Sequence, residues 1–307
     1  MKDLLREIVP NALWKLLSSI YRKFFKHKAP VHIENIFGFD LYQNNNDIID
    51  YSSYIGLSIE NLPHDEDSRI FRTIKCFLNE GDIAIDVGAN IGLMTLVMSS
   101  YCGSEGRVFS IEPGPVSTAL LKRNLYVNGA IGSNVTLKEC AISDFNGVIP
   151  LFINPNGESD NQVHKGLDGY EFRDEKSRQK VDVTALTLDN LLIEEGVSFD
   201  KVSFVKIDTQ GHEWYVLNGG RKFFSESENL AVLCEFAPYL KSWDLISIEK
   251  FVKLIKSFGF LIYDDSNLGA GAINVDYLLR NYGADKYGKY TDLLLVKGKS
   301  VDLVGKL

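Results

Sequence analysis

The period of the hydrophobic positions changes at one stretch near residue 80, and the rest of the chain can be arranged around it. The apolar run Ile83–Val87, interrupted by Asp86, has the length and β-branched content of a buried parallel strand. A turn of small and polar residues follows, and the apolar positions of 91–101 then recur at helical spacing. A strand that feeds a helix through a glycine turn is typical of the first unit of a doubly wound α/β sheet.

The same periodicities predict the other elements of an α/β domain. The expected strands are 37–42, 108–111, 135–141, 148–153, 181–184, 204–207, 230–235, 259–263 and 292–296. The expected helices are 68–78, 116–127, one that begins near Gly211 and runs to Gly219, and 246–257. We further expect 48–57 to pair back on 37–42 as a hairpin. The predicted organisation is a basic helix in 1–30, an approach segment in 31–80 and a catalytic domain in 81–300.

Residues 11–26 predict an amphipathic helix after Pro10, with leucines on one face and Lys and Arg over much of the rest. One interpretation packs this helix on the domain or on a second subunit. The other interpretation lays it on an anionic membrane, with Trp14 and Phe25 at the depth of the lipid headgroups.

Charge is unevenly distributed: the chain carries −8, but residues 1–28 carry +5, which leaves −13 on the remainder. So acidic a body argues against a nucleic-acid-binding groove. The four cysteines lie far apart without a C-x-x-C pair, which predicts buried free thiols and a reducing compartment. No signal peptide or membrane span is recognisable, so we expect a soluble, cytoplasmic protein, or one held peripherally at the inner face of the membrane.

The turn after the first strand favours one class of cofactor. A dinucleotide site needs G-x-G-x-x-G, whereas this chain has Gly88-Ala89-Asn90-Ile91-Gly92. Asp86, close to this turn, would repel a pyrophosphate and favour a cation such as the sulfonium and ammonium groups of S-adenosylmethionine. Glu112, twenty residues past Gly92, ends the second strand and can accept hydrogen bonds from both hydroxyls of a ribose.

Further strand ends supply the other candidate residues. Pro113 follows Glu112, and the segment Ile142-Ser143-Asp144 is expected to border the adenine. A turn-forming role for Asp144 is the alternative. The remaining candidates follow two later strands: Asp208, Gln210, His212 and Glu235. Asp208 and Gln210 are also expected to contact the cofactor.

These later residues suit the transfer of a methyl group to an alcohol, which must lose its proton near the moment of transfer. His212 titrates in the right range, Asp208 could orient it or act as the base itself, and Glu235 could bind the acceptor or act as base. Glu235 could alternatively join Asp208 in holding a divalent cation, but the acidic residues show no metal-ligand pattern, so no metal site is predicted. The polar loop 154–180 contains His164, and the tyrosines of 264–290 could stack on a sugar or pack under a loop.

Taken together, these segments resemble the FkbM-type methyltransferases of the S-adenosylmethionine-dependent, Rossmann-like class. The resemblance is carried by Gly81–Gly92, Ile111–Pro113 with Asn124 and Asn128, Leu188-Asp189, and Val205–Glu213. It implies a seven-stranded, mostly parallel sheet with an antiparallel last strand and helices on both faces. It also implies methyl transfer to oxygen, with sugar hydroxyls or polyketide-related alcohols as acceptors. The family commonly has an acid where this chain has Gln210, which moves the expected base to Asp208 and His212.

Two other classes of function remain open from the sequence. A nicotinamide-dependent oxidoreductase would tolerate loss of the Asp86 charge, although the broken glycine fingerprint argues against it. A binding module that acts through its N-terminal helix would need residues 1–28 and not Glu112.

Overall fold

The computed structural model describes residues 30–44, 55–58, 68–154, 161–163, 178–240, 246–283, 286 and 288–307. Its strands are β1 (Val31–Ile36), β2 (Phe39–Gln43), β3 (Ile83–Val87), β4 (Arg107–Ile111), β5 (Val135–Lys138), β6 (Ala141–Ile142), β7 (Gly147–Ile153), β8 (Gln179–Leu186), β9 (Val202–Ile207), β10 (Leu230–Phe236), β11 (Leu261–Asp264) and β12 (Thr291–Lys297). Its α-helices are α3 (Arg69–Phe77), α4 (Leu93–Cys102), α5 (Pro115–Val127), α6 (Leu188–Glu194), α7 (Glu213–Gly219), α8 (Arg221–Glu226), α9 (Ile248–Ser257) and α10 (Val275–Tyr282). Shorter 3-10 helices are η3 (Gly129–Asn134), η6 (Phe199–Lys201), η8 (Asp265–Ala270) and η9 (Gly298–Lys306).

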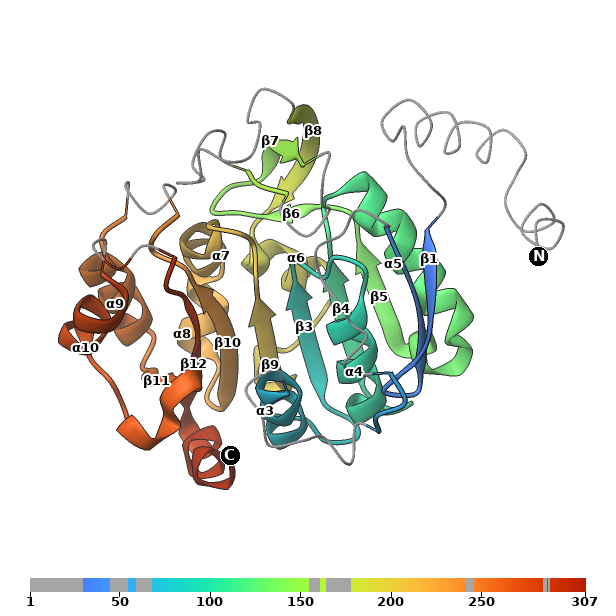
Figure 1. Cartoon of the computed structure of the whole chain (residues 1–307). Helices are drawn as coiled ribbons and strands as arrows, with labels where there is room; N and C mark the ends of the chain where they lie inside the picture. Colours follow the sequence, from blue (N-terminus) through green and yellow to red (C-terminus); the bar gives the residue numbers. More distant parts are fainter. Residues whose placement is uncertain are drawn as a thin grey trace, which may run out of the picture.

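Seven strands form the central sheet, in the order β11-β12-β10-β9-β3-β4-β5. The neighbours from β10 to β5 pair in parallel, whereas β12 runs antiparallel to both β10 and β11. The chain therefore has the expected Rossmann-like α/β fold, with the last strand inserted in the opposite direction between its two predecessors (Figure 1).

Each face of the sheet is buried under its own hydrophobic core, because alternate strand residues point to opposite faces. One core joins Ile85 and Val205 to α6, α7, α8, α9 and α10. The other joins Ala84 and Phe204 to α3, α4, α5 and the hairpin of β1 and β2. Described parts of the approach segment therefore share a core with the sheet. In Figure 1, α9 and α10 lie at one end of the sheet and α5 at the other.

The N-terminal hairpin differs from the prediction in the position of its turn. β2 pairs with β1, which precedes it. Phe37 and Gly38 make the two-residue turn, both with positive φ (54° and 87°), as a tight hairpin turn requires. Of the expected partner only 55–57 is described, where Ile55 makes a single bridge to Ile36.

The expected strand 135–141 is also wrong in its extent. β5 ends at Lys138, and Ala141 and Ile142 form β6 in a separate sheet of order β6-β8-β7. Ile142 pairs in parallel with Leu186 there, which turns this segment away from β4. Figure 1 shows the small sheet beyond the carboxyl ends of β3 and β4. The expected strands 148–153 and 181–184 are confirmed by β7 and β8, which pair with each other antiparallel.

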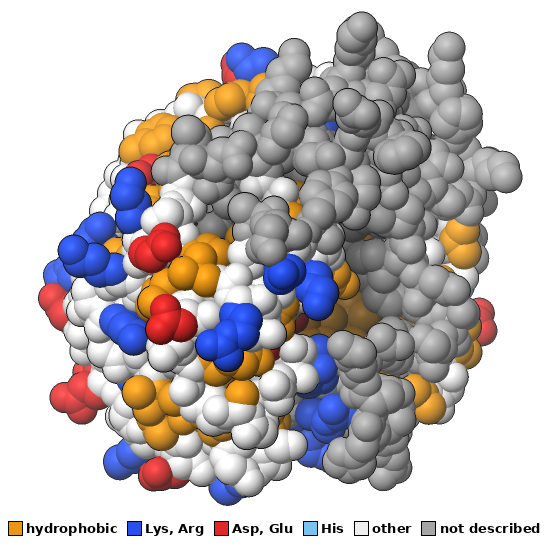
Figure 2. All heavy atoms as spheres, turned by 60° about the vertical axis from the view of Figure 1, so that its left-hand side comes forward, with side chains coloured by type: hydrophobic (Ala, Val, Ile, Leu, Met, Phe, Trp, Pro, Cys, Tyr) orange, Lys and Arg blue, Asp and Glu red, His pale blue; other side chains and the backbone are white. Residues whose placement is uncertain are grey.

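The expectation of buried free thiols holds for three of the four cysteines. Cys102, Cys140 and Cys234 are buried, Cys76 is half-buried, and all four thiols are free. Acidic and basic side chains are interspersed on the face that carries α9 and α10 (Figure 2). Within the described residues, no helix is both long and apolar enough to cross a membrane. The predicted helix 11–26, His164 and Tyr287 lie outside the described residues.

Candidate active site at the carboxyl edge of the sheet

The turn between β3 and α4 passes very close to the end of β9. The amides of Gly88 and Ala89 both donate to the Ile111 carbonyl, at 2.9 and 3.1 Å. Gly88 has φ +85°, and a Cβ there would lie 1.8 Å from the backbone oxygen of Asp208. Only glycine can adopt this backbone conformation and also leave room for the Asp208 oxygen. Gly92 begins α4 with φ +93°, and a Cβ there would lie 2.2 Å from Leu121 Cδ1.

Glu112 is held in place by this turn. Its Oε2 accepts a hydrogen bond from the Asn90 amide at 2.9 Å, and its Oε1 accepts one from the Gly114 amide at 2.7 Å. Asn90 adopts φ +49°, a left-handed conformation that brings its amide to the carboxylate. The side chain of Glu112 is 6% exposed, and burial raises its pKa to about 7 against the opposing backbone hydrogen bonds. Each oxygen keeps a lone pair for a further donor.

Asp86 lies beneath the turn, fully buried. Its Oδ2 accepts a hydrogen bond from Thr95 Oγ1 at 2.6 Å, and Thr95 in turn contacts Ser110 Oγ at 2.8 Å. Burial raises the pKa of Asp86, although Lys206 opposes the rise. Among the described residues nothing donates to Asp86 Oδ1 or Asn90 Oδ1, and both atoms are buried. Two orphaned acceptors beside Glu112 fit a ligand with donor groups, as the ammonium and ribose of S-adenosylmethionine would be.

Asn124, a motif residue without a sequence-assigned role, joins this turn to the N-terminal hairpin. Its Oδ1 accepts from the Tyr42 amide at 2.7 Å, and its Nδ2 donates to the carbonyls of Tyr42 (3.1 Å) and Ile91 (2.7 Å). Asn128, one turn later on α5, makes the equivalent pair of bonds to the backbone of Asp40. The two amides therefore fasten β2 to α5, and Asn124 also fixes the turn.

We expect Asn124→Ala to reduce the free energy of unfolding by about 3 kcal/mol, because three buried backbone groups lose their partner. Urea denaturation would measure this loss. Asn128→Ala is the control: its bonds are part-buried and should cost about 1 kcal/mol. Equal losses for the two variants would contradict the central role of Asn124.

The second cluster places Asp208 between two donors. Lys206 Nζ lies 2.8 Å from its Oδ2, and Gln210 Nε2 donates to its Oδ1 at 2.9 Å. Lys206 is 6% exposed and pairs in register with Asp86, so it also neutralises that carboxylate. Burial alone would raise the pKa of Asp208, but Lys206 and Gln210 hold it below its ordinary value. Lys206 was not among the residues expected from the sequence, although a lysine inside a buried strand is rarely unpaired.

Glu213 shapes the loop after Asp208 and is 1% exposed. Its Oε1 accepts from the amide and hydroxyl of Thr209, both at 2.9 Å, and from the amide of Gly211 at 3.1 Å. Gln210, held inside this loop with φ +53°, directs its amide toward both Asp208 and Glu235. Glu213 is therefore the anchor of the loop that presents Gln210.

His212 lies with the segment expected to border the adenine. Its Nε2 is 3.1 Å from Ser143 Oγ, its ring stacks on Tyr215 at 4.5 Å, and it is 2% exposed. The donors to Asp208 are Lys206 and Gln210, so Asp208 does not orient His212 as the sequence analysis suggested.

The three residues expected near the adenine have different surroundings. Ile142 and Ser143 are buried, and a Cβ at Gly219 would lie 1.9 Å from the Ser143 carbonyl. Asp144 is exposed and accepts a hydrogen bond from Asn218 Nδ2 at 3.1 Å. Of the three, Asp144 alone presents a side-chain acceptor to solvent.

Glu235 completes the candidate set and lies beside a residue that the sequence analysis did not single out. Gln210 Nε2 lies 3.3 Å from both of its carboxylate oxygens. Asp292, the second residue of β12, is its direct cross-strand partner. The sequence gives Asp292 as the start of a strand, and only the antiparallel insertion of β12 brings it here.

Tyr277 and Tyr282, candidates for sugar stacking, are bound elsewhere. Their hydroxyls donate to Asp264 Oδ2, at 2.9 and 2.6 Å. Thr291 Oγ1 donates to Oδ1 of the same carboxylate at 2.7 Å. These two tyrosines therefore hold α10 against the sheet, which matches the packing alternative. Tyr290 is 65% exposed.

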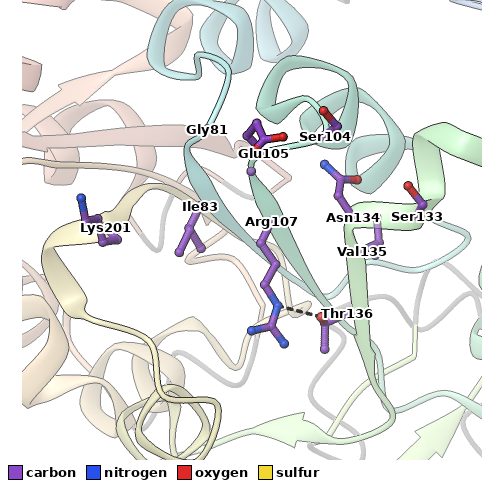
Figure 3. A pocket seen from close by; sticks show the side chains of 11 residues that line it. Gly81, Ile83, Ser104, Glu105, Arg107, Ser133, Asn134, Val135, Thr136 and Lys201 are labelled. Atoms are coloured by element: carbon purple, nitrogen blue, oxygen red, sulfur yellow. Dashed lines mark hydrogen bonds between the residues drawn. The ribbon is translucent and has the colours of Figure 1, made fainter.

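A pocket of about 480 Å³ lies at the opposite edge, at the amino ends of β3, β4 and β5 (Figure 3). Arg107, one of its lining residues, donates to Thr136 Oγ1 at 2.9 Å and pairs with Glu195. Ligands of open α/β sheets bind at the carboxyl ends of the strands, so we assign no cofactor to this pocket. Within the part of the chain that the structure describes, no group of His, Cys, Asp and Glu side chains could hold a metal ion.

Comparison with known proteins identifies the family. The model of the methyltransferase FkbM domain matches residues 86–261, more than half of the chain. Methyltransferase sdnD of Sordaria araneosa is 31% identical over 154 residues, which cover 44% of this chain and 59% of that protein. The 31-O-demethyl-FK506 methyltransferase FkbM of Streptomyces tacrolimicus is 25% identical over 195 residues, which cover 53% of this chain and 72% of that protein.

A crystal structure of methyltransferase FkbM from Methylobacillus flagellatus aligns with a TM-score of 0.40 and 16% identity, covering 77% of this chain and 56% of that one. The fold itself follows from the strand order and directions of the central sheet. The extent of the family match, together with the motifs at the carboxyl edge, leads to one assignment: the chain belongs to the FkbM methyltransferase family.

Proposed function

We propose that the protein is an S-adenosylmethionine-dependent O-methyltransferase whose acceptor is a hydroxyl group. The proposed acceptor is the hydroxyl of a sugar in a glycan or glycolipid. The observation that carries the proposal is Glu112, a buried carboxylate held by two backbone amides at the edge where no described residue donates to Asp86 Oδ1 or Asn90 Oδ1. The relative from Streptomyces tacrolimicus is a 31-O-demethyl-FK506 methyltransferase, which supports oxygen as the methylated atom.

The site residues would contact different parts of the cofactor and the acceptor. Glu112 would accept the ribose hydroxyls, Asp86 and Asn90 would face the amino-acid end, and Gly88, Ala89 and Gly92 would let the backbone approach. When bound, S-adenosylmethionine supplies a methyl group made electrophilic by its sulfonium. Ile142, Ser143 and Asp144 would border the adenine, with His212 fixed behind Ser143. Asp208, Gln210 and Glu235 would then face the acceptor.

The acidic surroundings also bear on the acceptor. Carboxylates accept hydrogen bonds from neighbouring hydroxyls, so Asp208 and Glu235 suit a polyhydroxylated molecule and disfavour an anionic one. The membrane contact predicted for 11–26 would bring such an enzyme to a lipid-linked acceptor, and that contact remains a prediction.

Calorimetric titration of S-adenosylhomocysteine into the wild type and Glu112→Ala tests the cofactor. We expect micromolar binding that the substitution weakens at least tenfold, about 1.4 kcal/mol. NAD is the control ligand and should show no binding. A folded wild-type protein that fails to bind S-adenosylhomocysteine would contradict the proposal. Binding would justify a screen of glycan acceptors for methyl transfer.

The affinity for the nucleoside should also depend on pH through Glu112. Its pKa of about 7 reflects burial first, and the ionised form accepts hydrogen bonds from ribose hydroxyls more strongly than the protonated form. We therefore expect binding of 5′-methylthioadenosine to weaken as pH falls below 7, up to about tenfold per pH unit. This probe has no amino-acid group that titrates. Glu112→Gln should remove the pH dependence, and an unchanged profile in that variant would contradict the assignment.

A further inference from the structure

Three carboxylates form a row across the carboxyl ends of β9, β10 and β12. Cys234 pairs with Ile207 in the parallel ladder, so Glu235 lies beside Asp208. Glu235 pairs with Asp292 in the antiparallel ladder. Alternation of the two cores along these strands directs Glu235 and Asp292 to the face that also carries Asp86 and Lys206. The row therefore starts at the cofactor edge and leads away from it.

The three carboxylates differ in their partners. Both oxygens of Asp208 are engaged, by Lys206 at 2.8 Å and by Gln210 at 2.9 Å. Glu235 has the Gln210 amide at 3.3 Å from each oxygen. None of the described residues donates a hydrogen bond to the Asp292 carboxylate. An ion-paired carboxylate is a weak base, so the more basic carboxylates of the row are Glu235 and Asp292.

The pKa values of Glu235 and Asp292 are raised, whereas that of Asp208 is lowered. Burial, followed by the charge of Asp208, raises the pKa of Asp292 to about 7, with Asp265 adding to the rise and Lys206 and Arg69 opposing it. Burial and the charges of Asp208, Glu213 and Asp292 raise the pKa of Glu235 well above its ordinary value, against Lys206. Glu235 and Asp292 are half-buried, direct cross-strand partners, and both carboxyls have raised pKa values, so we expect the pair to share one proton.

We propose that Glu235 takes the proton from the acceptor hydroxyl, and that Asp292 is a positioning residue that keeps Glu235 basic enough to do so. This inference rests on the proposed function. As the O–H bond breaks, the proton passes to a Glu235 oxygen, a lone pair of the acceptor oxygen forms the new bond to the methyl carbon, and the electrons of the sulfur–carbon bond stay on sulfur. Asp208, held by Lys206, stays ionised and aligns Gln210 against Glu235.

The free protein provides the first test, without cofactor or acceptor. A carboxyl whose pKa is higher in the folded state contributes stability that is present at low pH and is lost as pH rises through the folded pKa. We therefore measure thermal unfolding from pH 5 to pH 8 for the wild type, Asp292→Asn, Glu235→Gln and the exposed control Asp302→Asn. Glu112 adds the same slope to every variant, so it cancels in the comparison.

In Asp292→Asn and in Glu235→Gln, the free energy of unfolding should depend less on pH than in the wild type. The difference should correspond to about one proton, which is a tenfold change in the unfolding equilibrium constant per pH unit. Asp302→Asn should follow the wild type. An Asp292→Asn curve parallel to the wild type would overturn the shared proton and with it the inference. This comparison decides the inference even if the acceptor screen finds no substrate.

The second test uses an acceptor from the glycan screen. Glu235→Gln should lower kcat at least about 100-fold while S-adenosylhomocysteine affinity stays within twofold. Asp292→Asn should have the wild-type kcat at high pH. The decline of its kcat on the acidic side of the pH profile should shift to a pH about one unit lower, because the negative charge of Asp292 no longer raises the pKa of Glu235. An unmoved limb would overturn the role of Asp292. Failure of the wild type to bind S-adenosylhomocysteine would instead overturn the proposed function.

Discussion

Gly88→Ala is expected to reduce the free energy of unfolding by at least about 3 kcal/mol and to abolish cofactor binding. The new Cβ would lie 1.8 Å from the backbone oxygen of Asp208, at φ +85°. Relief of this clash must separate β3 from β9, where the Asp208 amide donates to the Val87 carbonyl at 3.0 Å. Chemical denaturation measures the loss.

Gly81→Ala is the matched control. Gly81 has φ +86°, almost the same as Gly88, but a Cβ there meets nothing within 4 Å. It should cost only the conformational term of about 1–2 kcal/mol. The difference between the two variants isolates the steric effect. Variants that differ by less than about 1 kcal/mol would show that β3 and β9 separate easily at this point.

Lys206→Met is expected to reduce the free energy of unfolding by about 3 kcal/mol at pH 8, because it leaves the buried Asp86 and the partly exposed Asp208 without their cation. The solvent exposure of Asp208 places this loss at the lower end of the cost of breaking a buried ion pair. Lys206 lies 2.8 Å from Asp208 and opposes the raised pKa of Asp86. Without it, burial raises the pKa of both carboxyls in the folded state. Stability is then lost as pH rises through those values, so the variant should be less impaired at pH 5 than at pH 8.

Denaturation at the two pH values measures this effect, with Lys201→Met as the control. Lys201 is exposed at the amino end of β9, and its replacement should change stability by less than about 0.5 kcal/mol at either pH. Adding Asp208→Asn to Lys206→Met should recover part of the loss, because one of the uncompensated charges is removed. A pH-independent loss would indicate that Lys206 contributes by packing alone.

Local pattern was sufficient where one element could be read by itself. The strand 83–87 was predicted with its observed bounds, and the expected helices correspond to α3, α4, α5, α7 and α9 within a few residues. A buried strand and an amphipathic helix each impose a period on their own residues, so the sequence contains the information. The expected strand 37–42 was wrong at its start, because residues 37 and 38 form the turn between β1 and β2.

The sequence alone determined the residue types of the site: a glycine turn, Glu112 at the next strand end, and acids after two later strands. Only the tertiary structure decided their relations, because hydrogen bonds and charge pairing depend on register between strands far apart in the chain. The tertiary structure places Lys206 beside Asp208, His212 beside Ser143, and Asp292 beside Glu235. The last pairing requires the antiparallel insertion of β12, and no periodicity within 291–297 encodes which strand lies beside it.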